Sequence, residues 1–69
     1  MTGDAQLTRR EREVWHLYLE GHATKEIAAR LCIDRTTVAY HKMTLMRKLG
    51  CRNFVELIKC GIRNGLTTP

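Results

Sequence analysis

The sequence predicts an all-α fold of four helices, because apolar residues recur at three- and four-residue intervals and four helix-start signals divide the chain. No segment alternates apolar and polar residues as a strand would. The length of 69 residues supports one domain with a small core, which we place at residues 8–66. Residues 1–7 are expected to form a flexible segment or the end of a linker, and residues 67–69 a short tail.

The first and last helices carry clear boundary signals. Thr8 and Glu11 fit a Ser/Thr-x-x-Glu capping box, in which each side chain bonds the backbone N–H of the other residue, and Gly21 ends this helix. Asn53 can cap the fourth helix and Gly65 can end it. We assign the charged side chains of the first helix to surface and capping roles; they are Arg9, Arg10, Glu11, Arg12 and Glu13.

The two middle helices lie close together along the chain. Thr24 is expected to cap a second helix that ends near Leu31, and Asp34 to cap a third that runs to Leu49. Only two or three residues would separate these two helices. A short helix, a tight turn and a longer helix with a basic outer face form a helix-turn-helix, the motif that inserts its second helix into the major groove of DNA.

The third helix has two distinct faces at 100° per residue. Val38, Leu45 and Leu49 fall within about 20° of one another and are expected to face the core. The opposite face consists of Thr36, Tyr40, Met43 and Arg47. A flank suited to sugar-phosphate contacts consists of Thr37, His41 and Lys48. Lys42 lies almost in line with the core stripe, so we expect its stem to follow apolar surface while its ammonium reaches water or a phosphate.

The basic residues gather in the second half of the chain. The net charge is +5, and residues 1–33 hold five basic and five acidic side chains, whereas residues 34–69 hold seven basic side chains against only Asp34 and Glu56. A solvated helix usually interleaves Glu with Lys four residues apart, but the third helix has no acid after its cap. This one-sided charge indicates a polyanionic partner.

Several function classes are excluded by what the sequence lacks. Cys32, Cys51 and Cys60 cannot all pair and show no CxxC or comparable spacing with the histidines, so we expect reduced thiols, a cytoplasmic setting and no metal or other cofactor. Charges interrupt every apolar run, which excludes a membrane span. Glu11 and Glu13 diverge on a helix, and no nucleophile with a base or phosphate-cradling loop occurs, so we expect no enzyme activity.

Three segments resemble one family in the right order. Residues 7–14, LTRREREV, resemble the opening LTxREREV motif of LuxR (GerE) domains, and residues 24–31, TKEIAARL, resemble their (S/N)KEIAxxL second helix. Residues 37–50 keep the spacing of the family's TVxxHxxxIxxKLG recognition helix. The match runs from about residue 7 to residue 66 and is similar throughout to the NarL/FixJ-like helix-turn-helix domains of bacterial transcription regulators.

The resemblance implies a tetrahelical effector domain that binds double-stranded DNA as a homodimer. It further implies that an N-terminal receiver or ligand-sensing domain can accompany such a domain, and that RNA polymerase is a possible partner. The family commonly dimerises through its fourth helix, which here offers Phe54, Ile58 and Ile62. Alternatives on the same helix are Val55, Leu57 and Gly61, and core packing is the competing explanation for each.

The DNA contacts that the family implies fall mainly on the third helix. Its base-reading positions correspond to Ala39, Tyr40 and Met43, and its backbone contacts to Thr37, His41 and Lys48. The complete set of candidate DNA-binding residues is Lys25, Thr36, Thr37, Ala39, Tyr40, His41, Met43, Thr44, Arg47 and Lys48. Lys25 belongs to this set because the start of the second helix often faces phosphate, although a solvated lysine is the alternative. Most members have Lys where this chain has Ala39, so we expect an unusual preferred sequence.

Two other functions stay open at this point. A protein-interaction module that keeps the fold but has lost specific DNA readout is favoured by Ala39, although it leaves the basic helix without a purpose. A sigma-type promoter-binding domain has a similar layout, but the first-helix motif argues against it.

Overall fold

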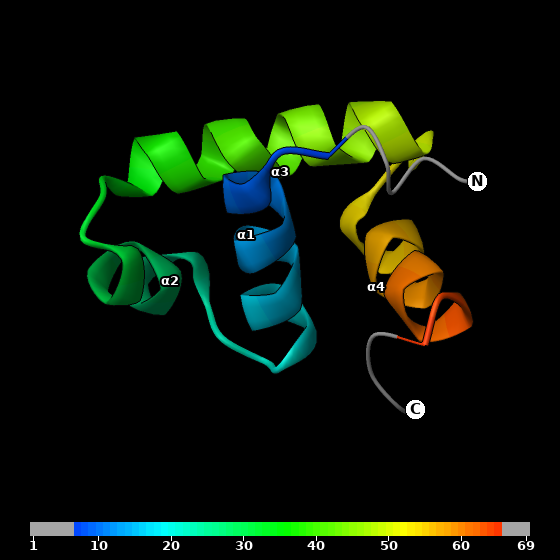
Figure 1. The fold of residues 1–69 in the computed structure, drawn as a ribbon, viewed down its shortest axis with the longest axis horizontal. Helices are drawn as coiled ribbons and strands as arrows, with labels where there is room; N and C mark the ends of the chain where they lie inside the picture. Colours follow the sequence, from blue (N-terminus) through cyan, green and yellow to red (C-terminus); the bar gives the residue numbers. More distant parts are fainter. Residues whose placement is uncertain (1–6, 66–69) are drawn as a thin grey trace.

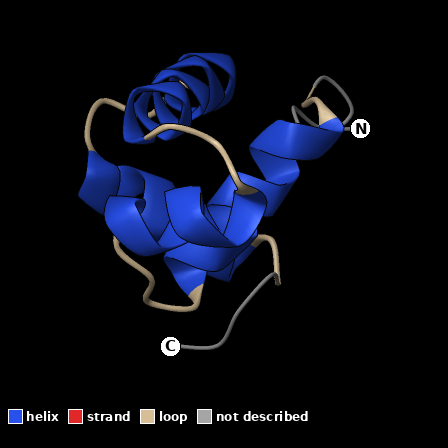
Figure 2. Cartoon of the chain, turned by 90° about the vertical axis from the view of Figure 1, so that its left-hand side faces the viewer, coloured by secondary structure: helices blue, strands red, loops and turns tan. Residues whose placement is uncertain are grey.

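Four α-helices make up the described part of the computed structural model, which covers residues 7–65. They are α1 (Arg9–Leu19), α2 (Thr24–Leu31), α3 (Arg35–Leu49) and α4 (Phe54–Arg63). The long helix α3 crosses the top of the molecule in Figure 1, with α2, α1 and α4 arranged side by side beneath it. Between residues 7 and 65 there is no strand, as Figure 2 shows, so the all-α, four-helix prediction is confirmed. The expectations for residues 1–6 and 66–69 lie outside the described residues.

The predicted caps of the first and last helices are confirmed. The Thr8 hydroxyl accepts from the Glu11 backbone N–H at 3.0 Å, and Glu11 Oε1 accepts from the Thr8 N–H at 2.8 Å. Asn53 Oδ1 accepts from the Glu56 N–H at 2.9 Å at the start of α4. Each bond satisfies a backbone donor that has no partner within its own helix.

The caps of the two middle helices differ from the prediction. The residue preceding α2 is Ala23, whose N–H donates to Glu26 Oε1 at 3.0 Å, so Thr24 is the first helical residue and not the cap. The Thr24 hydroxyl instead shares a 2.7 Å hydrogen bond with the Tyr18 hydroxyl, which ties α2 to α1. Asp34 does occupy the cap position of α3, but its side chain makes no capping hydrogen bond.

The turn of the helix-turn-helix consists of three residues, 32–34, as the sequence predicts. Cys32 has a φ of 58°, and it is the one non-glycine residue within 7–65 in the left-handed region. This conformation ends α2 and lets the Ile33 N–H return to the Ala28 carbonyl at 3.0 Å. The tight turn therefore sets the direction in which α3 leaves α2.

The core consists of two clusters of buried side chains, to which α3 contributes Val38 and Leu45. One contains Val14, Tyr18, Ile27, Ala28 and Val38, and the other contains Leu7, Trp15, Leu45 and Leu57. The Trp15 indole N–H donates to the Leu57 carbonyl at 3.2 Å, so α1 holds α4 by a buried hydrogen bond as well as by packing. Leu7 is only 5% exposed, so its side chain belongs to the second cluster of the core.

Candidate nucleic-acid interface

The inner face of α3 is the part that the sequence predicts best. Val38 and Leu45 have no exposed surface, and Leu49 is half-buried against the second cluster. These side chains seat α3 on α1 and α2. Burial of its inner stripe fixes which residues α3 presents to solvent.

The outer face of α3 is exposed along its whole length. The exposed residues there are Thr36, Ala39, Tyr40, Met43 and Arg47. Tyr40 and Met43 are 58% and 51% exposed, although both are large side chains with apolar surface. No acidic residue occurs within α3, so this face is apolar and basic without any negative charge.

The other predicted DNA-binding residues lie on the flank of α3 and at the start of α2. Thr37 and His41 are half-buried on the flank of α3, and the His41 ring lies edge-to-face with Tyr40 at 5.9 Å between centroids. Lys25 is exposed on the first turn of α2. Thr44 turns inward, because its hydroxyl donates to Glu11 Oε2 at 2.6 Å.

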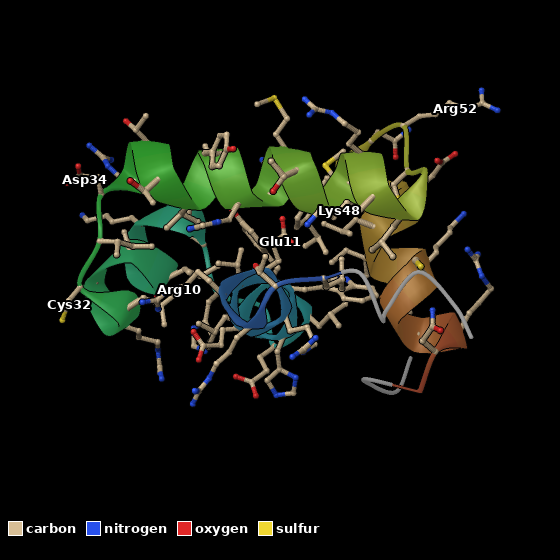
Figure 3. All side chains as sticks on the ribbon, turned by 45° about the horizontal axis from the view of Figure 1, so that its top comes forward. Arg10, Glu11, Cys32, Asp34, Lys48 and Arg52 are labelled. Atoms are coloured by element: carbon tan, nitrogen blue, oxygen red, sulfur yellow. The ribbon has the colours of Figure 1, made fainter. Side chains whose placement is uncertain are left out.

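Glu11 lies at the centre of the interface between α1 and α3, and its assignment to the surface is wrong. It is 3% exposed, and Lys48 Nζ donates to its Oε1 at 2.9 Å in addition to the contacts from Thr8 and Thr44. Figure 3 shows Glu11 rising from α1 toward Lys48 on α3. One carboxylate therefore caps α1 and anchors the C-terminal half of the basic helix.

The charge on Glu11 is strongly favoured in the folded protein. Burial by itself would raise the pKa of this carboxyl, but hydrogen bonds from Thr44, the Thr8 N–H and Lys48, with the Lys48 charge, outweigh it and lower the pKa from 4.5 to about 2. The carboxylate thus stays ionised at any ordinary pH. Lys48, whose side chain is 32% exposed, is held in place by this anion.

The Lys42 ammonium lies against aromatic rings, whereas the sequence predicts that it reaches water or a phosphate. It lies 5.8 Å from the centroid of the Tyr18 ring and 5.6 Å from that of the Phe54 ring. The two rings meet edge-to-face at 5.1 Å, and together they form a cation–π site that joins α1, α3 and α4.

The predicted dimer residues of α4 and their alternatives separate into three groups by exposure. Leu57 and Gly61 are buried, Gly61 directly against Leu19, so these two alternatives belong to the core and not to a free surface. Ile58 and Ile62 are half-buried, and Ile58 packs against the first cluster. The two exposed apolar residues are Phe54 at 39% and Val55 at 59%.

The fold and this surface define a class of protein: a helix-turn-helix domain in which α3, the second helix of the motif, turns an acid-free face to solvent. The profile of the family described as "Bacterial regulatory proteins, luxR family" matches residues 5–60. The chain belongs to this family and is a helix-turn-helix DNA-binding domain of transcription regulators. No helix within the described residues has both the length and the apolar character needed to cross a membrane.

Several curated proteins are similar to this chain. The response regulatory protein YgeK of Escherichia coli is 42% identical over 67 residues, which are 97% of this chain and 46% of that protein. The transcriptional regulatory protein UhpA of Escherichia coli is 49% identical over 53 residues, 77% of this chain and 27% of that protein. The spore germination protein GerE of Bacillus subtilis is 44% identical over 59 residues, 80% of each chain.

The chain thus spans less than half the length of YgeK and UhpA. A search of solved structures gave no significant match.

Proposed function

We propose that this domain binds double-stranded DNA in a sequence-specific manner, with α3 in the major groove, as the effector part of a transcription regulator. The observation that carries the proposal is the division of α3 into a buried inner stripe and an exposed, acid-free outer face. Tyr40, Met43 and Ala39 are assigned to base edges, where apolar groups contact thymine methyls. Thr36 and Arg47 border them on the same face.

We assign the contacts to the sugar-phosphate backbone to the flank of α3 and the start of α2. Thr37, His41 and Lys48 would lie along one DNA strand, and Lys25 would meet a phosphate near the N-terminus of α2. Thr44 acts differently in this proposal, because its hydroxyl bonds Glu11 and so positions α3 for DNA contact.

Two copies would meet through α4 on a pseudo-palindromic site. Val55 and Phe54 supply the exposed apolar surface for this contact, with Ile58 and Ile62 at its half-buried edge. Two-fold pairing would set half-sites about one helical turn apart or overlapping. In a longer protein, a receiver or ligand-sensing domain would control this pairing, RNA polymerase would be a further partner, and the working compartment would be the cytoplasm.

The test is a titration of the chain with random and then selected duplexes at several salt concentrations, with sedimentation of the same complexes. We expect affinity to fall steeply with salt, with a log–log slope near −0.9 per phosphate neutralised. We expect two copies on a selected palindrome and one on a half-site. A folded chain that ignores DNA at low ionic strength would identify a protein-interaction module instead.

Lys48→Gln is expected to weaken binding to all sequences alike and to flatten the salt slope by about one unit. Glutamine can keep a hydrogen bond to Glu11 while it removes the charge, so the fold is retained. The control is Arg9→Gln on α1, where the side chain is 90% exposed and pairs with Glu13 at 3.6 Å. An equal slope change in both variants would remove Lys48 from the backbone contacts.

A further inference from the structure

Two of the four Lys and Arg side chains of α3 are directed to other helices of the domain. The Lys42 ammonium lies 5.8 Å from the centroid of the Tyr18 ring and 5.6 Å from that of the Phe54 ring. Lys48 Nζ donates to Glu11 Oε1 at 2.9 Å. Neither ammonium group therefore lies on the outer face of α3.

The other two basic side chains of α3, Arg35 and Arg47, lie at its ends. Arg35 is the first residue of the helix. Arg47 is exposed on the outer face, but it belongs to the last turn, four residues and about 6 Å beyond Met43. A guanine contact from either arginine would therefore fall at an edge of the outer face and not at its centre.

The centre of the outer face lacks every side chain that makes paired hydrogen bonds with a base. Its exposed residues are Thr36, Ala39, Tyr40 and Met43. Arg and Lys pair with guanine, Asn and Gln pair with adenine, and Asp and Glu accept from cytosine, but none of these types occurs at the centre. The two hydroxyls there can bond several bases and do not select one. Thymine, through its 5-methyl, is the base that presents an apolar group in the major groove.

The centre of the outer face has the length of a short run of base pairs. Thr36 and Met43 are seven residues apart, which is about 10 Å along the helix axis. At 3.4 Å per base pair this length corresponds to about three base pairs. The other three helices lie on the opposite side of α3 (Figure 1), so nothing in the described part of the chain covers this face.

We propose that the domain recognises the centre of each half-site through thymine 5-methyl groups, over about three consecutive base pairs that contain no guanine contact. The inference rests on the proposed function and names the class of DNA that the domain binds. Ala39, Tyr40 and Met43 supply the apolar surface against which these methyl groups are buried. Burial of one methyl group corresponds to about 4-fold in affinity, and burial of two or three to about 15- to 60-fold.

The test replaces thymine by deoxyuridine, which removes the 5-methyl group and keeps the hydrogen-bonding groups of the base edge. A duplex is first selected from random sequences with the native chain. Its thymines are then replaced one at a time, and each duplex is titrated at a single salt concentration. We expect about 4-fold weaker binding for each central thymine replaced and no change for thymines outside the half-sites.

Variants of the outer face show whether the chain itself contacts the methyl groups. Tyr40→Ala and Met43→Ala are each expected to bind the selected duplex more weakly and to lose the thymine–uracil difference at one base pair. The matched control is Arg47→Ala on the same face, where affinity falls but the thymine–uracil ratio stays at its native value. An effect of uracil on DNA shape would persist in all three variants.

The outcomes separate this inference from the proposed function. Equal affinities for the thymine and uracil duplexes would overturn the inference and leave the proposed function standing. Selection of guanine at the centre of the half-site would do the same, as would a thymine–uracil difference that every variant retains. A folded chain without salt-dependent affinity for any duplex would contradict the proposed function, and this inference with it.

Discussion

Glu11→Ala is expected to lower the free energy of unfolding by about 2–4 kcal/mol, a large share of the stability of so small a domain. Alanine removes one acceptor from three donors at once: the Thr8 N–H, the Thr44 hydroxyl and the Lys48 ammonium. Thr44 then loses its charged partner in a half-buried position, and α1 loses half of its capping box. Denaturant unfolding followed by circular dichroism measures the change.

The matched control for this substitution is Glu13→Ala, two residues along the same helix. The Glu13 side chain is 39% exposed and pairs with Arg9 and Arg10 at 3.6 and 3.2 Å on the surface. Such pairs contribute at most about 1 kcal/mol, and we expect a loss of about 0.5 kcal/mol here. If the two alanine variants were equally destabilised, the anchoring role of Glu11 would have to be abandoned.

The same carboxylate predicts how stability depends on pH. The folded pKa of Glu11, about 2, lies below its ordinary value of 4.5. The stabilisation is therefore complete above pH 4.5 and is lost as the pH falls through about 2. Its size is on the order of 3 kcal/mol at most. Unfolding measured from pH 6 to pH 2 should show the native chain converging on Glu11→Gln as the acid is added; a constant difference would contradict the assignment.

Local signals explain which parts of the fold could be predicted from the sequence. The capping box of Thr8 and Glu11 lies within four consecutive residues, and the core stripe of Val38 and Leu45 follows from helical periodicity alone. Both features depend only on residues that are close together in the sequence. The three-residue turn before α3 could be predicted in the same way, because the pattern of α2 ends near Leu31 and the cap signal at Asp34 follows soon after it.

Long-range contacts explain what could not be predicted. The capping box is enough to explain a glutamate at position 11. No nearby residue indicates that its second oxygen accepts a hydrogen bond from Thr44, 33 positions away. Threonine is a favourable residue at a helix cap, but the Thr24 hydroxyl is hydrogen-bonded to the Tyr18 hydroxyl instead. The exposure of Phe54 is likewise reduced by Tyr18, a partner from a different helix. In the candidate site, helical periodicity correctly predicts which residues of the outer face of α3 are exposed. It does not predict that the Thr44 side chain turns inward, because that orientation comes from its hydrogen bond to Glu11.

Tyr40→Ala and Met43→Ala are expected to change which base pairs the domain prefers, at a cost of about 1–3 kcal/mol for each lost base contact. Such a loss corresponds to roughly 5- to 150-fold in affinity for the native site. Both side chains are more than half exposed, so neither substitution removes core packing, and stability should change by about 0.5 kcal/mol or less. Selection from random duplexes followed by sequencing measures the preference of each variant.

Val55→Ala provides the matched control, because Val55 is an apolar residue of similar exposure, 59%, on α4. It should leave the selected bases unchanged at the positions that Tyr40 and Met43 contact, even where its effect on pairing of two copies weakens total binding. Exposed apolar surface, such as that of Tyr40 and Met43 on α3, lowers the solubility of a protein. In the proposed complex, thymine methyls and base edges would cover these two side chains. Variants that select the same sequence as the native chain would show that these two residues do not read bases.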